Sequence, residues 1–316
     1  MRERRLRAMN TDVQLLVVGD DRRADERLER AALAFIAHER ALSRFDPNSD
    51  LSALNRAGSR WTRVAPLLFD ALAAAAALSE QTGGLYNPAI LPALEAAGYD
   101  RSFERLSPPP AEDGASPASA EGRAPPRAPA PAHPFALDHE LRAVRLAPAV
   151  RLDLGGIGKG LAVDAAAAEL ADQTGFLIDA GGDIRVGGQS PDGGAWGIAV
   201  QDPTDLEQDL AVLAVESGAV ATSSVARRRW LQRGEVRHHL IDPRTGRSAE
   251  SDVLAATVLA PSCATAEVFA KAVVIAGAAA GSALIDQAHL AALVVDRGGR
   301  PRANAAMQPF VAATSG

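Results

Sequence analysis

The sequence predicts an α+β fold in which mixed or antiparallel sheets are flanked by helices. Strand-like runs in the second half of the chain are short and separated by turn residues, as in β-hairpins. Helical patterns lie before and after these runs instead of alternating with each strand, which argues against a doubly wound parallel sheet. The chain has 316 residues, of which 47% are hydrophobic, so it can bury one large core or two ordinary ones.

The first third of the chain predicts one strand and two helices. Residues 9–18 alternate between apolar and polar side chains, as a strand with one buried face does. Residues 25–42 repeat apolar side chains at helical spacing. A second helix is expected to begin at Pro66, because proline is favoured in the first turn, and to end at Gly83 and Gly84.

The composition changes abruptly between Ser107 and Pro134, where proline, alanine, serine and glycine predominate. Such a segment cannot bury enough apolar surface to offset the entropy lost on ordering it. We therefore expect a disordered insertion over residues 107–134. Strand-like pieces lie close to it on both sides, so we interpret it as a long loop inside one domain.

After the insertion, the chain predicts a helix, a series of strands, two further helices and a final strand. The expected helices are 161–174, 262–275 and 279–287, and the expected strands are 176–180, 196–200, 210–215, 236–241, 253–259 and 291–295. No repeat with a fixed short period is visible.

Composition and charge exclude several classes of protein. The net charge is -6, and basic residues are scattered except in the first seven positions and at Arg227–Arg229, so no nucleic-acid-binding stripe is expected. We interpret Arg227–Arg229 as a solvated surface in preference to a phosphate clamp. The single cysteine, Cys263, excludes an intrachain disulfide and a cysteine-rich metal site.

No apolar run is long enough to predict a membrane span. The first seven residues carry charge without the apolar stretch that a signal peptide needs. We therefore expect a cytoplasmic protein.

The most informative segment is Arg151–Asp164, where a strand ending at Asp153 runs into a glycine-rich turn and then a helix. Glycines let the backbone approach a ligand closely, while the helix N-terminus and Lys159 supply positive charge, which suits a phosphorylated ligand. The glycine spacing does not match a dinucleotide fingerprint, and Gly160 stands where a P-loop needs a hydroxyl. A glycine-rich helix start without a ligand is the alternative.

Four other polar segments each have a structural explanation when taken alone. Residues 43–55 and 83–92 contain turn and capping residues after predicted helices. Residues 219–224 end a strand in hydroxyl groups, which could bind phosphate or cap the backbone. Residues 239–246 place a histidine near the end of a strand that runs into a tight turn.

In this order and with these gaps, the segments resemble the ApbE family of FAD:protein FMN transferases. The resemblance extends from about Met9 to the last strand. It is carried by seven segments: Met9–Thr11, Ser43–Asn55, Gly83–Pro92, Leu152–Asp164, Ile178–Arg185, Ala219–Ser223 and His239–Gly246.

The resemblance implies a single α+β domain over residues 9–312, with the insertion inside it, that binds FAD in an extended groove. It also implies that, with Mg²⁺, the FMN half of FAD is transferred to a serine or threonine hydroxyl of an acceptor protein and AMP is released. The binding positions that it implies are Met9, Phe45, Ala96, Ala97, Gly98, Asp153, Lys159 and His239. We further expect Thr222 and Ser223 to contact phosphate or the acceptor, and His239 to orient or deprotonate the acceptor hydroxyl.

The sequence departs from the family where the metal is expected to bind. Family members commonly carry an aspartate and, four residues later, a threonine; Glu267 and Lys271 stand at these positions. The Glu267 carboxylate and the main-chain oxygen of Gly156 can ligate Mg²⁺, whereas a charged lysine cannot. We therefore expect a weakened or lost metal site, with Glu267 and Lys271 still among the candidate catalytic residues. Either they form an ordinary helical ion pair, or the Lys271 ammonium replaces part of the charge of the metal.

Three functions are consistent with these residues. The first is FMN transfer from FAD to an acceptor protein. The second is an FAD pyrophosphatase, in which water attacks in the same site and FMN and AMP are released. The third is an FAD-binding protein without turnover, for which Lys271 is the main argument.

Overall fold

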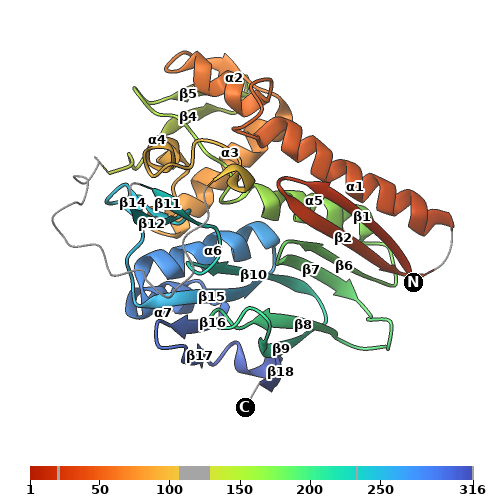
Figure 1. Cartoon of the computed structure of the whole chain (residues 1–316). Helices are drawn as coiled ribbons and strands as arrows, with labels where there is room; N and C mark the ends of the chain where they lie inside the picture. The colour runs from red at the N-terminus through yellow and green to blue at the C-terminus, as the bar shows by residue number, and fades with distance from the viewer. Residues whose placement is uncertain (20–21, 107–128, 233, 315–316) are drawn as a thin grey trace.

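The computed structural model describes residues 1–19, 22–106, 129–232 and 234–314, and Figure 1 shows how their elements are arranged. An antiparallel sheet forms the centre of the fold, in the order β1-β2-β6-β7-β10-β15-β16-β17. Its strands are β1 (Arg2–Ala8), β2 (Thr11–Val18), β6 (Gly175–Ala180), β7 (Asp183–Gly188), β10 (Gly218–Ser224), β15 (Val253–Ala260), β16 (Ala291–Asp296) and β17 (Pro301–Ala303). The predicted α+β class with antiparallel sheets is confirmed.

Helices cover one face of this sheet. The helix α5 (Gly158–Leu170) packs on β6 and β7, while α6 (Cys263–Ala276) packs on β10 and β15. A longer helix, α1 (Arg22–Leu42), packs on α5, and α7 (Ala278–Gln287) packs on α6. Figure 1 shows α6 along the sheet beside β10 and β15. The largest apolar core lies between these helices and the sheet, with Phe35, Leu15 and Phe269 fully buried in it.

A smaller sheet covers the opposite face. It consists of β8 (Trp196–Gln201), β9 (Asp209–Val215) and β18 (Val311–Thr314) in the order β18-β9-β8. A second apolar cluster, which includes Ile198, Leu213 and Val220, lies between the two sheets. Successive residues of a strand point to opposite faces, so the residues of β10 contribute alternately to the two clusters.

The remaining elements form the region that carries most of the candidate site. Its helices are α2 (Asp50–Ala57), α3 (Pro66–Gln81), η1 (Pro88–Ile90), α4 (Leu91–Ala96) and η2 (Phe103–Arg105). The short helix η5 (Gln308–Phe310) lies apart from them and packs on β9 of the smaller sheet. Its strands are β3 (Thr62–Arg63), β4 (Phe135–Asp138) and β5 (Ala143–Leu146) in one sheet, and the pairs β11 (Arg229–Gln232) with β12 (Glu235–His238) and β13 (Ile241–Asp242) with β14 (Arg247–Ser248). The β11–β12 hairpin packs on α4 through Trp230 and Leu94.

Three expected strands differ from the observed ones. The strand expected to end at Asp153 is not formed, because residues 151–154 lie outside the helices and strands. The first strand is the second arm of a hairpin, whose other arm, β1, is rich in arginine and shows little apolar alternation. Met9 and Asn10 form its two-residue turn with φ of 52° and 63°, as a type I′ turn requires. The expected strand over residues 236–241 is interrupted: β12 ends at His238 and β13 begins at Ile241. This break leaves His239 outside the ladders.

The helix limits are close to the predicted ones. The helix expected over residues 161–174 begins three residues earlier, at Gly158, because residues of the glycine-rich segment form its first helical turn. The helix expected from residue 262 uses Ser262 as its N-cap, whose hydroxyl accepts from the amide of Thr265.

The expected insertion over residues 107–134 lies partly outside the described residues, which omit 107–128. Residues 129–134 hold regular contacts with the rest of the chain. The amide of Ala130 donates to Pro243 O at 2.8 Å, and the side chain of Asn87 donates to Pro131 O at 3.0 Å. The expectation of disorder is therefore wrong for residues 129–134.

Among the described helices, none is both long and apolar enough to cross a membrane.

Candidate functional site

Two adjoining pockets lie between the loop after α1, the start of α5 and the loop after β10. Together with the open solvent space at their mouths, their volumes are about 680 and 780 Å³. Both are lined by Arg44, Phe45, Tyr99, Asp153, Gly155 and Arg228. The first pocket extends to His239 and Lys271, and the second extends to Met9 and Lys159. Together they provide an elongated space with basic side chains along it.

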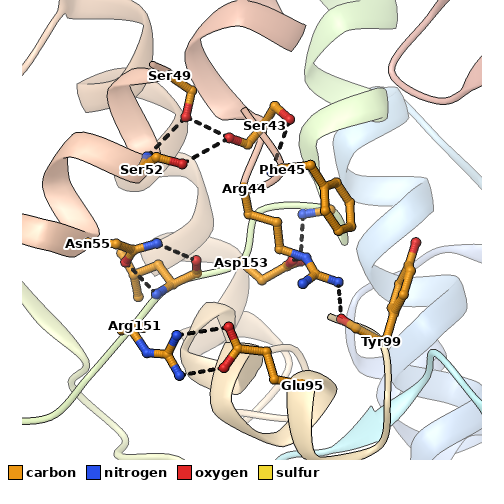
Figure 2. Close-up of polar contacts among 12 residues, drawn as sticks. Ser43, Arg44, Phe45, Ser49, Ser52, Asn55, Glu95, Tyr99, Arg151 and Asp153 are labelled. Atoms are coloured by element: carbon orange, nitrogen blue, oxygen red, sulfur yellow. Dashed lines mark hydrogen bonds and ion pairs between the residues drawn. The ribbon is translucent and has the colours of Figure 1, made fainter. Parts of the chain in front are cut away.

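An ion pair between Arg44 and Asp153 lies at the boundary shared by the pockets. Arg44 Nε is 2.5 Å from Asp153 Oδ2, and the two side chains are 6% and 8% exposed. Arg44 also donates to Tyr99 O at 2.8 Å, and Figure 2 shows its guanidinium between Asp153 and Tyr99. The guanidinium carbon lies 4.1 Å from the ring centroid of Phe45 and 4.6 Å from that of Tyr99. Aromatic faces and a carboxylate thus fix this cation in place.

Serine hydroxyls hold the loop that carries Arg44 and Phe45. Ser49 Oγ accepts from the amide of Ser52 at 3.0 Å, which caps α2, and donates to Ser43 O at 2.6 Å (Figure 2). The Ser43–Asn55 segment therefore has the capping role that its sequence allows. The same caps place Arg44 at the pocket.

The segment before the glycine-rich turn is held by side chains from two other helices. Asn55 donates to Leu152 O at 2.9 Å and accepts from Leu152 N at 2.8 Å, as a backbone strand would. Arg151 forms a two-pronged pair with Glu95 of α4 (Figure 2). These contacts at the two residues before Asp153 fix its direction into the pockets.

Two glycines of the turn are needed for different structural reasons. A Cβ at Gly160 would lie 2.6 Å from backbone atoms of Ala264, so this glycine allows α5 and α6 to pack closely. A Cβ at Gly156 would lie 3.1 Å from the ring of Tyr86 and 3.5 Å from Cε of Lys271. Gly156 therefore leaves room for two side chains that line the first pocket.

Lys159, Asp183, Glu267 and Lys271 form a buried ionic cluster at the base of the pockets, which we call the Glu267 cluster. Glu267 Oε1 is 3.0 Å from Lys271 Nζ and 3.2 Å from Lys159 Nζ, while Oε2 accepts from the amide of Gly160 at 2.9 Å. Lys159 also pairs with Asp183, at the start of β7. The sequence contains only these two lysines, although lysine and arginine together number 33. Both lysines therefore contact the same carboxylate.

Burial and the surrounding charges set the protonation of this cluster. Burial by itself would raise the pKa of Glu267, but Lys159, Lys271 and the Gly160 amide outweigh it and hold this pKa at about 2. Burial lowers the pKa of Lys159, which the Glu267 carboxylate partly offsets. Glu267 is therefore an anion at neutral pH, compensated by the two lysines.

The residues present do not fit a divalent metal ion at Glu267. Both carboxylate oxygens already accept hydrogen bonds, and the Lys271 ammonium lies within 3.0 Å of one and 3.4 Å of the main-chain oxygen of Glu267. A second cation at that carboxylate would face two ammonium groups. In the part of the chain that the structure describes, no group of three or more histidine, cysteine, aspartate or glutamate side chains could hold a metal ion.

Two buried polar atoms at the first pocket have no hydrogen-bond partner among the described residues: His239 Nδ1 and the Tyr86 hydroxyl. Burial lowers the pKa of His239 well below its usual value, and Arg228 and Lys271 lower it further, so the imidazole is neutral. Burial likewise raises the pKa of Tyr86 well above its usual value, which keeps the phenol protonated. Buried polar atoms of this kind are usually satisfied, so these two can accept from or donate to a ligand.

Most of the predicted site residues meet at these pockets. Met9, Phe45, Asp153, Gly156, Lys159, His239 and Lys271 line one or both of them, and Glu267 lies behind the lysines. The glycine-rich turn, the loop after α1 and the segment after β12 thus converge, although they are far apart in the sequence.

Other predicted residues lie away from the pockets. Ala97 O accepts from Trp230 Nε1 at 2.7 Å and Ala96 O from Gln232 Nε2 at 3.1 Å, so the Ala96–Gly98 turn is engaged by the β11–β12 hairpin. Gly98 has φ of 88°, and a Cβ at this position would lie 2.8 Å from the Gln232 side chain.

The two hydroxyl residues of β10 also differ from expectation. Thr222 bonds to Thr257 at 2.9 Å between their hydroxyl oxygens and lines a separate pocket on the face toward the smaller sheet. Ser223 is buried and lines neither of the two pockets. Strand alternation sends the two side chains to opposite faces, so the segment cannot present both hydroxyls to one ligand.

Sequence reasoning missed several residues of the site. Arg44 and Tyr99 had no assigned role, and Tyr86 was noted only within a turn. Arg228 was interpreted as part of a solvated triplet, but it lines both pockets. The backbone bends at Arg228, which has φ of 50°, and the neighbouring residue Arg227 is exposed. The adjacency of Arg44 to Phe45 was the one available signal, because arginine commonly stacks on aromatic rings.

Comparisons with known proteins agree with this geometry. A family model described as "ApbE family" matches residues 9–294. An FAD:protein FMN transferase from Vibrio cholerae is 33% identical over 171 residues, covering 52% of this chain and 51% of the relative. One from Escherichia coli K12 is 30% identical over 156 residues, covering 48% and 44%. The chain thus spans about half the length of the curated relatives that it matches.

Solved structures agree with the fold over nearly the whole chain. The ApbE protein from Thermotoga maritima has a TM-score of 0.83 and 26% identity, with 98% of each chain covered. The flavin transferase ApbE from Vibrio cholerae has a TM-score of 0.78 and 20% identity, again with 98% of each chain covered. The second likeness concerns the fold alone.

Proposed function

Because the chain belongs to the ApbE family, we propose that it is an FAD:protein FMN transferase. Homologues of this family are flavin transferases, and curated relatives of about 30% identity carry that name. The proposed substrates are FAD and an acceptor protein that presents a serine or threonine hydroxyl. The proposed products are the flavinylated acceptor and AMP.

One observation carries this proposal: two pockets join at a group of basic side chains. Arg44 and Arg228 line both pockets, while Lys271 borders the first and Lys159 the second. FAD has the matching form, two ring systems joined by an anionic pyrophosphate. Cations held in partly dehydrated surroundings bind phosphate oxygens strongly and place them accurately.

The proposed reaction is a displacement at the phosphorus of the FMN half. The acceptor oxygen forms the new phosphorus–oxygen bond, the bond to the phosphate of AMP breaks, and the hydroxyl proton passes to a base. AMP leaves with the electron pair of the broken bond. Such a transfer depends mainly on alignment and on spreading charge over the phosphate oxygens, for which the basic side chains are suited.

His239 is the proposed base. Its imidazole is neutral and its Nδ1 has no partner among the described residues, so the tautomer that is protonated at Nε2 has a lone pair on Nδ1 for the proton of the acceptor. The cations that lower its pKa would themselves be compensated by the bound pyrophosphate, which would increase its basicity during turnover.

The test incubates the purified protein with FAD, with and without candidate acceptor proteins, and follows AMP by chromatography and flavin fluorescence on denaturing gels. AMP and covalent flavin that form only with an acceptor support transfer. AMP without any acceptor indicates the pyrophosphatase, and tightly bound FAD without AMP under all conditions would reject both enzymes.

A matched pair of variants assigns the base. His239→Asn is expected to lower the transfer rate about 100-fold or more while FAD still binds, because a general base contributes that much. His238→Asn is the control, since His238 is half-buried, is hydrogen-bonded through Nε2 to Ala249 O, and lines neither pocket. Equal losses in the two variants would indicate a structural role for His239.

A further inference from the structure

The Lys271 ammonium lies at the position where the family resemblance implies a metal-ligand hydroxyl. It contacts Glu267 Oε1 at 3.0 Å and the main-chain oxygen of Glu267 at 3.4 Å, and its side chain passes beside Gly156. Lys271 is 14% exposed and borders the first pocket. Its charge is therefore fixed between the carboxylate and the ligand space.

The use of lysine here is selective. The chain contains only two lysines, and all its other cationic side chains with permanent charge are arginines. A simple ion pair to Glu267 could be made by arginine, which pairs with carboxylates elsewhere in the chain, as Arg44 does with Asp153. An ammonium differs from a guanidinium because it is a compact point charge, which makes it more similar to a metal ion.

The charges of the Glu267 cluster balance only when Lys271 is included. Lys159 and Lys271 offset Asp183 and Glu267. Without Lys271, one uncompensated carboxylate would lie beside the space proposed for an anionic pyrophosphate. A divalent cation or an ammonium can supply the missing charge, and the chain provides the ammonium itself.

We propose that Lys271 is a built-in replacement for the divalent cation, so that this protein binds the pyrophosphate of FAD without a metal ion. The inference rests on the proposed function for the identity of the ligand. Its metal part stands separately: the unliganded protein has no divalent-cation site at Glu267, and replacement of the Lys271 ammonium by a hydroxyl creates one.

The first experiment measures Mn²⁺ binding to the full chain without FAD, from the loss of the electron paramagnetic resonance signal of unbound Mn²⁺. The unaltered protein is expected to take up no Mn²⁺ stoichiometrically at micromolar concentrations. Lys271→Thr, which supplies a hydroxyl beside Glu267, is expected to bind one equivalent, and Lys271→Met is expected to bind none. Stoichiometric binding by the unaltered protein that Glu267→Gln abolishes would overturn the proposal.

The second experiment measures FAD affinity by quenching of flavin fluorescence, in EDTA and in millimolar Mg²⁺. The unaltered protein is expected to bind FAD equally well in both. Lys271→Thr should lose roughly tenfold or more in EDTA and recover with Mg²⁺, while Lys271→Met should lose affinity without recovery. A tenfold requirement of the unaltered protein for Mg²⁺ would contradict the proposal.

The two experiments separate this inference from the proposed function. If the unaltered protein binds no FAD in either buffer, the proposed function fails. The Mn²⁺ titration still decides the metal part, because it uses no FAD.

Discussion

Glu267→Gln should change the pH dependence of stability in a defined way. The substitution keeps the size of the side chain and leaves an oxygen for the Gly160 amide, but it removes the charge that compensates Lys159 and Lys271. Glu267 is 1% exposed, so solvent screens these interactions little. The stability of the variant therefore shows how much the ion pairs of the Glu267 cluster stabilise the fold.

The magnitude follows from the pKa. Although burial opposes ionisation, Lys159 and Lys271 hold the pKa of Glu267 at about 2, compared with an ordinary value of 4.5. Because the folded protein binds this proton less tightly than the unfolded chain, the ionised cluster stabilises the fold above pH 4.5. That stabilisation is lost as the pH falls through about 2. This difference in pKa between the folded and unfolded states contributes about 3 kcal/mol to the free energy of unfolding at pH 7, of which about 2 kcal/mol is lost by pH 3.

The assay is urea unfolding of both proteins, followed by circular dichroism between pH 7 and pH 3. At pH 7 the variant should be less stable by about 3 kcal/mol, and the gap should shrink to about 1 kcal/mol at pH 3. Glu216→Gln makes the same chemical change at an exposed position and should stay within about 0.5 kcal/mol at each pH. A gap that does not change with pH would refute the assignment of a low pKa to Glu267.

Three further outcomes are expected. Asn55→Ala should destabilise the fold by about 2–3 kcal/mol in urea unfolding, because it leaves two backbone groups of Leu152 unpaired, whereas exposed Asn48→Ala should change little. Tyr86→Phe should stabilise the unliganded protein by about 1 kcal/mol, since it removes a buried hydroxyl without a partner among the described residues. The same substitution should weaken FAD binding, and stronger FAD binding would contradict a ligand role for this hydroxyl. Lys159→Ala should weaken the binding of FAD more than the binding of riboflavin in calorimetric titrations, because the lost contact is to phosphate. Equal weakening of both ligands would contradict a phosphate contact by Lys159.

The sequence predicted those parts of the fold whose signal is local. The α6 cap at Ser262 and the start of α3 at Pro66 follow from short-range backbone chemistry, and both are observed. Strand β1 was missed because its buried side chains are few and its arginines hide the alternation. Its turn at Met9 and Asn10 lacks the glycine that usually indicates a hairpin.

The site was predictable where a motif fixes the backbone and less so where the site depends on distant packing. Asp153 and Lys159 lie in one segment, so their spacing showed that they face one ligand space. Arg228 reaches that space only because its turn folds it back over the pockets, which no local pattern indicates. The prediction for Thr222 was wrong because both faces of the central sheet are covered. The sequence alone does not show which residues of β10 point to which face.

The retention of a carboxylate at Glu267 needs an explanation if no metal ion binds there. Oε2 accepts from the Gly160 amide, which ties α6 to the first turn of α5 at the point where Gly160 lets the two helices approach most closely. Oε1 contacts both lysines, and these border different pockets. Neutralising Glu267 would leave two buried ammonium groups repelling each other beside a helix junction. The carboxylate therefore positions the two cations for one ligand, a role that remains necessary when an ammonium replaces the metal.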